Sequence, residues 1–217
     1  PVHVGERVIT YDHVSRNRFV TRYAYHHGYF DGEEREFRGF GLVEQRDTEA
    51  FGAFEADGLL DDAENLDQAT HVPPVLTQTW FHTGAYLGRD RVSRGFEDEY
   101  YLETGLTVDE APNLLLPDTI LPDNLTAEEE REACRALKGS MLRQEVYALD
   151  GTDDEPHPYT VTEQNFTIER LQPRGDNRHT VFFTHPREVI TYHYERNPED
   201  PRIDHAFTLD VDEYGNV

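Results

Sequence analysis

The sequence predicts a mainly β fold, in which antiparallel hairpins form a curved open sheet with one short α-helix near 127–138. Two observations carry this prediction. Segments of alternating residues recur along the chain and are separated by turn-forming pairs such as Asp31-Gly32 and Asp150-Gly151. A full set of helix start and stop signals occurs at 126–139, whereas three prolines within 106–125 exclude a long helix there.

The first predicted elements are a strand at 7–11 and an aromatic hairpin at 23–48, which holds six aromatic residues. Tyr23, Tyr25 and Tyr29 occupy odd positions, so an extended chain projects them from one face. Asp31-Gly32 indicates a tight turn because both residues adopt positive φ readily. A longer loop over 31–34, with Gly32 as its bend, is the alternative. After the turn, Phe37, Gly39, Gly41 and Val43 repeat the spacing of two, and a glycine within such a strand, as in Gly39-Phe40-Gly41, indicates a bulge or close packing.

The middle of the chain changes character twice. Residues 52–71 are rich in acid and glycine, which predicts a surface loop. The β-branched and aromatic content of 75–83 predicts a strand, and 84–98 reads as irregular. Thr126 and Glu129 form a capping-box pattern, and Gly139 supplies a left-handed stop. The predicted helix therefore packs through a narrow apolar stripe of Ala133, Cys134 and Leu137.

From 140 onward the pattern is β again. A strand at 141–149, a turn at Asp150-Gly151 and a return strand at 159–171 are expected, followed by a pair of strands at 180–184 and 188–196 around Pro186. Residues 203–211 lead into a Tyr214-Gly215-Asn216 turn. Hairpins of this kind recur without an exact repeat, which predicts a loose β-repeat architecture with one helical insertion at 126–139.

Composition limits the classes of function. Forty-four acidic residues against twenty basic ones leave a formal net charge of −24, which repels nucleic acid and anionic lipid. No run of about 18 apolar residues is present, so no membrane-spanning helix is expected. The chain shows no signal peptide and no initiator methionine. We therefore expect residues 1–217 to be a single β-rich segment of a larger protein.

The chemistry-bearing residues give no catalytic or cofactor site. Adjacent residues on a strand point to opposite faces, so His26 and His27 cannot readily share a metal, and a metal site that includes His82 is not favoured. A solitary Cys134 within a helix indicates a buried thiol. Neither a nucleophile elbow nor a phosphate-binding loop occurs. An exposed tyrosine row could bind sugar, although a row inside a sheet is more often core.

Five segments, at 23–48, 73–84, 136–151, 158–173 and 194–217, resemble the middle region of the B subunit of bacterial insecticidal toxin complexes, the TcdB-like family. Examples are PPVLTQTWFHTG at 73–84 and the terminal DEYGNV, whose Tyr-Gly-Asn is similar to a turn of Rhs/YD repeats. The segments follow the family's order and cover most of the chain. The residues that carry this structural motif are Tyr23, Tyr25, Tyr29, Asp31, Gly32, Phe37, Gly39, Phe40, Gly41, Trp80, His82, Gly84, Tyr214, Gly215 and Asn216.

The resemblance implies a non-enzymatic role. In that family the B and C subunits build a hollow β-sheet shell around an unfolded toxic cargo, and the pore-forming A subunit delivers it. The implied partners are therefore a C subunit, or a downstream Rhs region that carries the cargo, and an A subunit that docks on other regions. A secreted or cell-surface location follows from the resemblance. Free sheet edges also predict either an edge-strand homodimer of the isolated segment or edges covered by the acidic loop and the helix.

Two other classes of function are open from the residues. A carbohydrate-binding β-sandwich with an aromatic platform is the main alternative, and it requires Tyr23, Tyr25, Phe37 and Phe40 to be presented in a groove rather than packed. A metal-dependent hydrolase is the third, and it requires a bound metal. No catalytic residue, cofactor or metal ligand is assigned.

Overall fold

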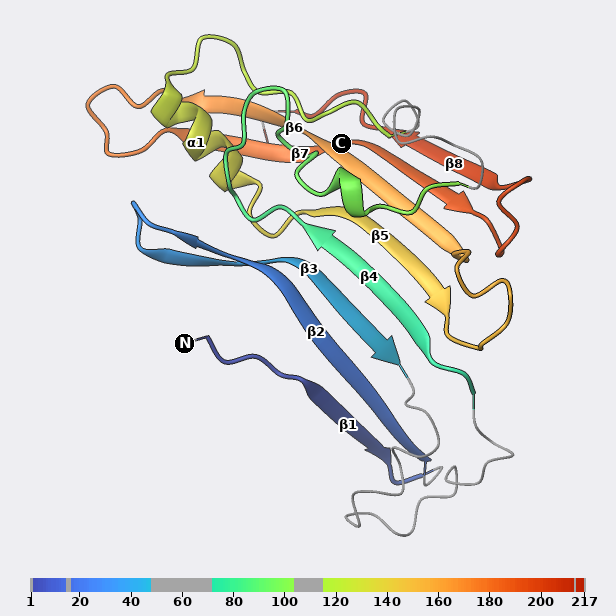
Figure 1. The fold of residues 1–217 in the computed structure, drawn as a ribbon. Helices are drawn as coiled ribbons and strands as arrows, with labels where there is room; N and C mark the ends of the chain where they lie inside the picture. The colour runs from blue at the N-terminus through green and yellow to red at the C-terminus, as the bar shows by residue number, and fades with distance from the viewer. Residues whose placement is uncertain (1, 15–16, 48–71, 104–114, 213, 217) are drawn as a thin grey trace.

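The computed structural model describes residues 2–14, 17–47, 72–103, 115–212 and 214–216. Within these ranges, eight strands form one open sheet in which every strand pairs antiparallel with its neighbours in sequence (Figure 1). The predicted fold class is confirmed. The strands are β1 (Arg7–Asp12), β2 (Asn17–Asp31), β3 (Glu36–Asp47), β4 (Val75–Phe81), β5 (Met141–Ala148), β6 (Thr160–Gln172), β7 (Val181–His193) and β8 (Arg202–Phe207).

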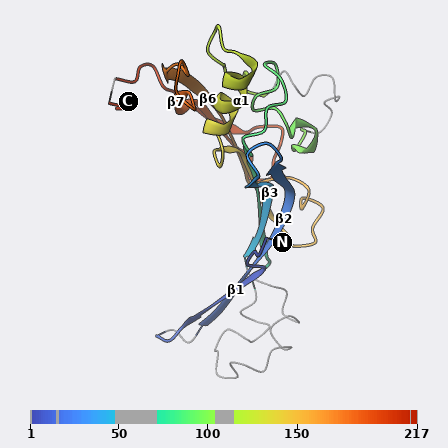
Figure 2. The same ribbon diagram turned by 90° about the vertical axis from the view of Figure 1, so that its left-hand side faces the viewer.

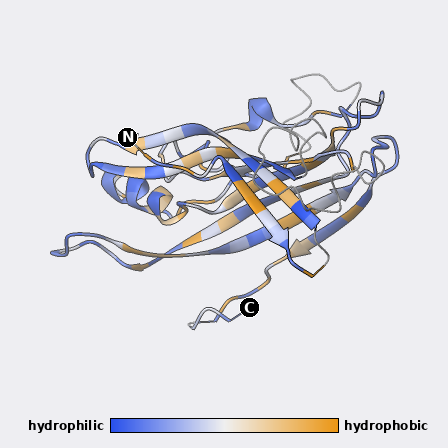
Figure 3. Ribbon diagram, turned by 90° about the horizontal axis from the view of Figure 1, so that it is seen from below, coloured by the Kyte–Doolittle hydropathy of each residue, from blue (hydrophilic) through white to orange (hydrophobic). Residues whose placement is uncertain are grey.

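The sheet is bowed, and its two faces differ. Figure 2 shows helix α1 (Ala127–Ala136) and the segment 82–103 on the convex side of the sheet. The central part of the concave side carries no described helix or loop. Along the strands, hydrophobic and hydrophilic bands alternate (Figure 3), as expected where successive side chains point to opposite faces.

Two small apolar clusters lie between the sheet and the elements on its convex side. The larger joins Ala133 and Cys134 of α1 and the adjoining Leu137 to Phe166 and Ile168 of β6, among others. The second consists of Leu42, Trp80 and Tyr100. The covering segment 82–103 includes a short 3-10 helix at Glu97–Glu99, so its prediction as irregular holds for most of its length.

Helix α1 confirms its sequence signals. The Glu129 amide donates to Thr126 Oγ1 at 3.2 Å, and the Thr126 amide donates to Glu129 Oε2 at 2.9 Å. Ala133, Cys134 and Leu137 are fully buried, and Gly139 adopts a φ of 83° just beyond the helix. The helix ends at Ala136, two residues before the predicted limit. Burial raises the pKa of the Cys134 thiol to about 12, which fits a packing role.

Two predicted local features are wrong. The β2–β3 loop spans 32–35, and its left-handed residue is Arg35 (φ 53°) rather than Gly32. The observed loop is therefore closer to the longer loop predicted over 31–34 than to a two-residue Asp-Gly turn. Residues 180–184 and 188–196 do not pair with each other: β7 runs through Pro186 as one strand between β6 and β8. A bulge explains this, because Asn165 pairs with Glu188 and Phe166 with Pro186, which leaves Arg187 as the extra residue.

The predicted acidic loop at 52–71 lies outside the described residues. Residues 115–125 of the proline-containing stretch contain no helix, as expected. No helix in the described part of the chain is long and apolar enough to cross a bilayer.

Candidate interaction surfaces

The aromatic hairpin is packed within itself and is only half exposed. Tyr23, Tyr25, Phe37 and Phe40 are all half-buried. The rings of Tyr23 and Tyr25 have centroids 6.4 Å apart, and Tyr25 lies 5.0 Å from Phe40, which contacts Phe37 edge-on. The Tyr25 hydroxyl donates to the Gly5 carbonyl at 2.9 Å. Since the rings contact one another at varied tilts, they form no flat platform for a sugar.

Glycines in the hairpin have the two roles that the sequence predicts. Gly39 adopts a φ of 102°, and the β2–β3 register shifts between Gly28 and Phe30. Gly41 provides close packing, because a Cβ built there would overlap the Phe96 ring and lie 3.0 Å from His27 Cβ. Phe96 belongs to the covering segment, so Gly41 lets that segment approach the sheet.

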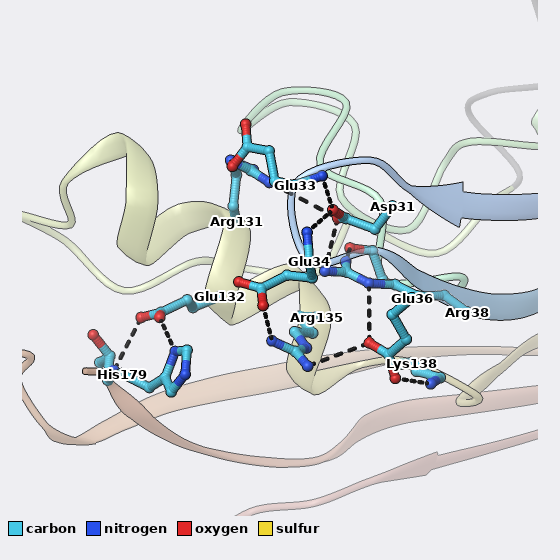
Figure 4. Close-up of polar contacts among 12 residues, drawn as sticks. Asp31, Glu33, Glu34, Glu36, Arg38, Arg131, Glu132, Arg135, Lys138 and His179 are labelled. Atoms are coloured by element: carbon cyan, nitrogen blue, oxygen red, sulfur yellow. Dashed lines mark hydrogen bonds and ion pairs between the residues drawn. The ribbon is translucent and has the colours of Figure 1, made fainter.

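The tip of the β2–β3 hairpin is held against α1 by charged side chains (Figure 4). Asp31 accepts hydrogen bonds from the Glu33 and Glu34 amides, each at 2.9 Å, and its Oδ2 lies 2.8 Å from Arg38 Nη2. These amide bonds, together with Arg38, hold the pKa of Asp31 below its usual value despite burial. From the helix side, Arg131 pairs with Glu33, and Lys138 Nζ lies 2.8 Å from Glu36 Oε1.

His82 and Gly84 fix the start of the covering segment. His82 is buried; its Nε2 lies 2.7 Å from the Val92 carbonyl, and its Nδ1 accepts from the Gly84 amide at 2.9 Å. This pairing requires the neutral ring with its proton on Nε2. Burial lowers the pKa of His82 to about 4. Gly84 adopts a φ of 79°, and a Cβ there would lie 3.2 Å from Arg135 Cα, so the segment passes close to α1.

A buried ion network, which the sequence analysis missed, fastens the covering segment to the sheet centre. Arg143 Nε donates to Glu145 Oε1 at 2.6 Å, and its Nη1 donates to Glu163 Oε2 at 2.9 Å. Both carboxylates also accept backbone amides, from Tyr101 and Leu116 respectively, each at 2.9 Å. Burial raises the pKa of Glu163, and Arg143 opposes that change.

Trp80 is 1% exposed, and its Nε1 donates to Glu99 Oε2 at 3.1 Å, which adds a second attachment of the covering segment. Arg143 and Glu145 are two positions apart on β5, so their side chains project from the same face of the strand. Charged residues at this spacing ordinarily indicate a face that is exposed to solvent. Their burial depends on a covering segment that is distant in sequence, so no local signal identifies them.

The C-terminal turn has the predicted form. Asp212 Oδ1 accepts the Tyr214 and Asn216 amides at 2.9 and 2.8 Å, and Gly215 adopts a φ of 84°. Tyr214 is 81% exposed. A Cβ at Gly215 would lie 3.3 Å from the Phe183 ring, so the turn packs against one end of the sheet.

The histidines do not converge on a common centre. His26 and His27 are exposed, with ring centroids 6.5 Å apart, and each pairs with a different glutamate. Among the described residues, no group of three His, Cys, Asp or Glu side chains has the proximity a metal ion needs. The predicted residues thus lie in three places: the aromatic hairpin and its tip, the start of the covering segment, and the C-terminal turn.

The described residues form an open antiparallel sheet with small apolar clusters on one side, which defines a mainly β protein. Two family models match it: the insecticide toxin TcdB middle/N-terminal region over residues 1–84, and the TcdB middle/C-terminal region over residues 132–217. The chain belongs to the TcdB-like middle-region family of insecticidal toxin complexes. A search of curated proteins found no match.

Solved structures give the same assignment. The crystal structure of TcdB2-TccC3-Cdc42 matches with a TM-score of 0.76 and 31% identity over 99% of this chain. TcdB2-TccC3 without its hypervariable C-terminal region gives 0.75 and 33% over 99%. The Tc holotoxin pore of Photorhabdus luminescens gives 0.70 and 33% over 93%. This chain spans 9% of each matched chain. The carbohydrate-binding alternative is not favoured.

Proposed function

We propose that residues 1–217 are a single wall segment of a toxin-complex B subunit, and that this wall helps to enclose and deliver a toxic cargo. The observation that carries the proposal is an eight-stranded sheet whose outermost strands, β1 and β8, each pair on one side only within the described part of the chain. Such edges favour continuation of the sheet by neighbouring strands. Its likeness to a short part of TcdB2-TccC3 supports the same role.

The role is structural rather than catalytic. The buried charged groups of the segment are engaged in fastening loops to the sheet, as Arg143, Glu145 and Glu163 show. The partner is a TccC-type C subunit that carries the cargo, and a pore-forming A subunit completes the assembly through other regions. The complex acts outside the cell that produces it. Rhs/YD repeats continue the sheet beyond the Tyr214-Gly215-Asn216 turn.

Edge strand β8 allows a direct test. The Thr208 amide donates to the Arg187 carbonyl at 2.9 Å, so by antiparallel alternation the amides of residues 206, 204 and 202 also face β7, and that of Ile203 faces outward. Ile203→Pro therefore removes an outward donor while it leaves the β7 pairing. Ile203→Ala keeps the donor and is the matched control.

In the complete B subunit assembled with its C partner, Ile203→Pro should make the cargo more sensitive to added protease, and Ile203→Ala should not. Equal protection by both variants and by a protein that lacks residues 1–217 would show that this segment does not contribute to the enclosure.

A further inference from the structure

We propose that a cavity between the β2–β3 hairpin and the covering segment binds a small uncharged aromatic molecule that carries one hydrogen-bonding group. The cavity has a volume of about 370 Å³, which lies within the range of small-molecule sites. This inference goes beyond the wall role and does not depend on it.

The walls of the cavity come from three parts of the chain that are distant in sequence. Strand β2 contributes residues 27–29, and β5 contributes Leu142. The covering segment contributes residues between His82 and Phe96. Because these parts meet only in the folded protein, no local sequence pattern predicts the cavity.

The lining of the cavity carries no formal charge of its own. None of its eleven residues is Asp, Glu, Lys or Arg, although these four types make up 29% of the chain. His82 is neutral at pH 7, because burial lowers its pKa to about 4. His27, at the edge, already has a carboxylate partner, since its Nε2 lies 2.8 Å from Glu99 Oε1. A charged ligand would lose its hydration here without gaining a counter-charge, so the ligand is uncharged.

The site is formed before any ligand enters. Val92 and Leu142 are each 3% exposed, and both belong to the larger apolar cluster. His82 is fixed by its contacts with the Val92 carbonyl and the Gly84 amide. At the rim, Leu87 is 58% exposed, so the fold leaves a large apolar side chain open beside the cavity. A ligand that covers this surface gains from the removal of apolar area from water.

Size and ring contacts indicate an aromatic ligand. An apolar cavity of about 150 Å³ holds one benzene molecule, so a cavity of about 370 Å³ accommodates two fused rings. The rings of His27 and Phe96, both on the cavity wall, have centroids 5.1 Å apart and are tilted by 31°. A planar ligand extends this contact by offset or edge-on packing.

Thr83 supplies the polar contact. This residue lines the cavity and is 8% exposed, and its hydroxyl has no hydrogen-bond partner within the described ranges. The oxygen is not among the fully enclosed unpaired atoms, so a small molecule can reach it. A buried hydroxyl without a partner is unfavourable, and a ligand that pairs with it removes that cost.

Two probes of the same shape test the assignment. β-Naphthol and β-methylnaphthalene differ only in a hydroxyl against a methyl group, and each is titrated into the complete B subunit while its fluorescence is followed. We expect a saturable binding component that Ala85→Trp abolishes, because the larger side chain fills the cavity. Ala206→Trp, on the exposed strand β8, is the matched control and should bind both probes as the wild type does.

Thr83→Val then tests the polar contact without a change of volume. It should weaken binding of β-naphthol several-fold and leave binding of β-methylnaphthalene unchanged. No saturable binding, or binding that Ala85→Trp leaves intact, would overturn the site. An equal effect of Thr83→Val on both probes, or none on either, would overturn the contact with the hydroxyl. The Tm of each variant checks its fold, and if Ala85→Trp lowers the Tm, the comparison of the two probes in Thr83→Val decides.

Discussion

Gly41 marks the tightest approach between the sheet and its covering segment. Because a Cβ at this position would overlap the Phe96 ring, Gly41→Ala must displace either Phe96 or the hairpin. We expect a loss of about 1–3 kcal/mol in the free energy of unfolding, measured by urea denaturation. Gly32→Ala is the matched control, because Gly32 has no atom within 4 Å of a built Cβ and no positive φ. The free energy of unfolding of this variant should stay within about 0.5 kcal/mol of the wild-type value.

An equal, small effect of both substitutions would contradict close packing at Gly41. A large loss of stability in Gly32→Ala would instead support the tight Asp31-Gly32 turn that the sequence predicts.

His82 should make stability fall with acid. Its folded-state pKa, about 4, lies below the ordinary histidine pKa of 6.5, so the unfolded chain takes up the proton first as the pH falls. The contribution of the neutral ring is complete above about pH 6.5 and declines toward pH 4, although Asp118 favours the charged form. Between pH 7 and pH 5 this linkage amounts to about 2 kcal/mol.

The measurement is urea denaturation of the wild type and of His82→Gln at both pH values. As the pH falls from 7 to 5, the free energy of unfolding of the variant should decrease by about 2 kcal/mol less than that of the wild type. Parallel losses in the two proteins would show that His82 is not the titrating group.

At the scale of elements, the network around Arg143 joins β5, β6 and the covering segment. Arg143→Ala leaves Glu145 and Glu163 buried without their counter-charge, and removal of one partner from a buried ion network costs about 3–5 kcal/mol. Arg202→Ala removes a pair with Glu195 in which both side chains are more than half exposed, so its cost should be below about 0.5 kcal/mol.

Thermal unfolding of the two variants compares these costs directly. Similar small shifts in Tm for Arg143→Ala and Arg202→Ala would mean that the Tyr101 and Leu116 amides stay bound to Glu145 and Glu163 without the help of Arg143.

At the scale of the whole molecule, the sheet has two edges that are open within the described residues, β1 and β8. Apolar side chains along them are exposed, with Ile203 at 54%, Phe207 at 57% and Val8 at 49%. We expect residues 1–217 to self-associate through these strands at micromolar concentration, and Ile203→Pro to weaken this association because it removes an outward amide. Sedimentation velocity over a concentration series measures both effects.

Ile203→Ala again serves as the control, since it shortens the side chain but keeps the amide. A protein that sediments as a monomer at every concentration, or association that persists equally in Ile203→Pro, would count against edge pairing through β8.

The sequence by itself determined most of the local structure of this protein, with the β2–β3 turn and the break at Pro186 as the exceptions. Alternation located the strands, Thr126, Glu129 and Gly139 set the helix, and Gly39 and Gly41 indicated a bulge and close packing, because these features depend on residues near in sequence. The family followed from the same segments. Only the tertiary structure decided that β7 continues through Pro186, because a bulge at Arg187 of β7 keeps Pro186 paired with Phe166 of β6.

The tertiary structure also decided which face is covered. Arg143, Glu145 and Glu163 are buried because segments distant in sequence cover one face of the sheet, where the Tyr101 amide donates to Glu145 and the Leu116 amide donates to Glu163. The centre of the concave face has no such cover among the described residues (Figure 2). Strand alternation separates two faces but does not say which of them will be covered, since covering depends on where a connecting segment crosses the sheet.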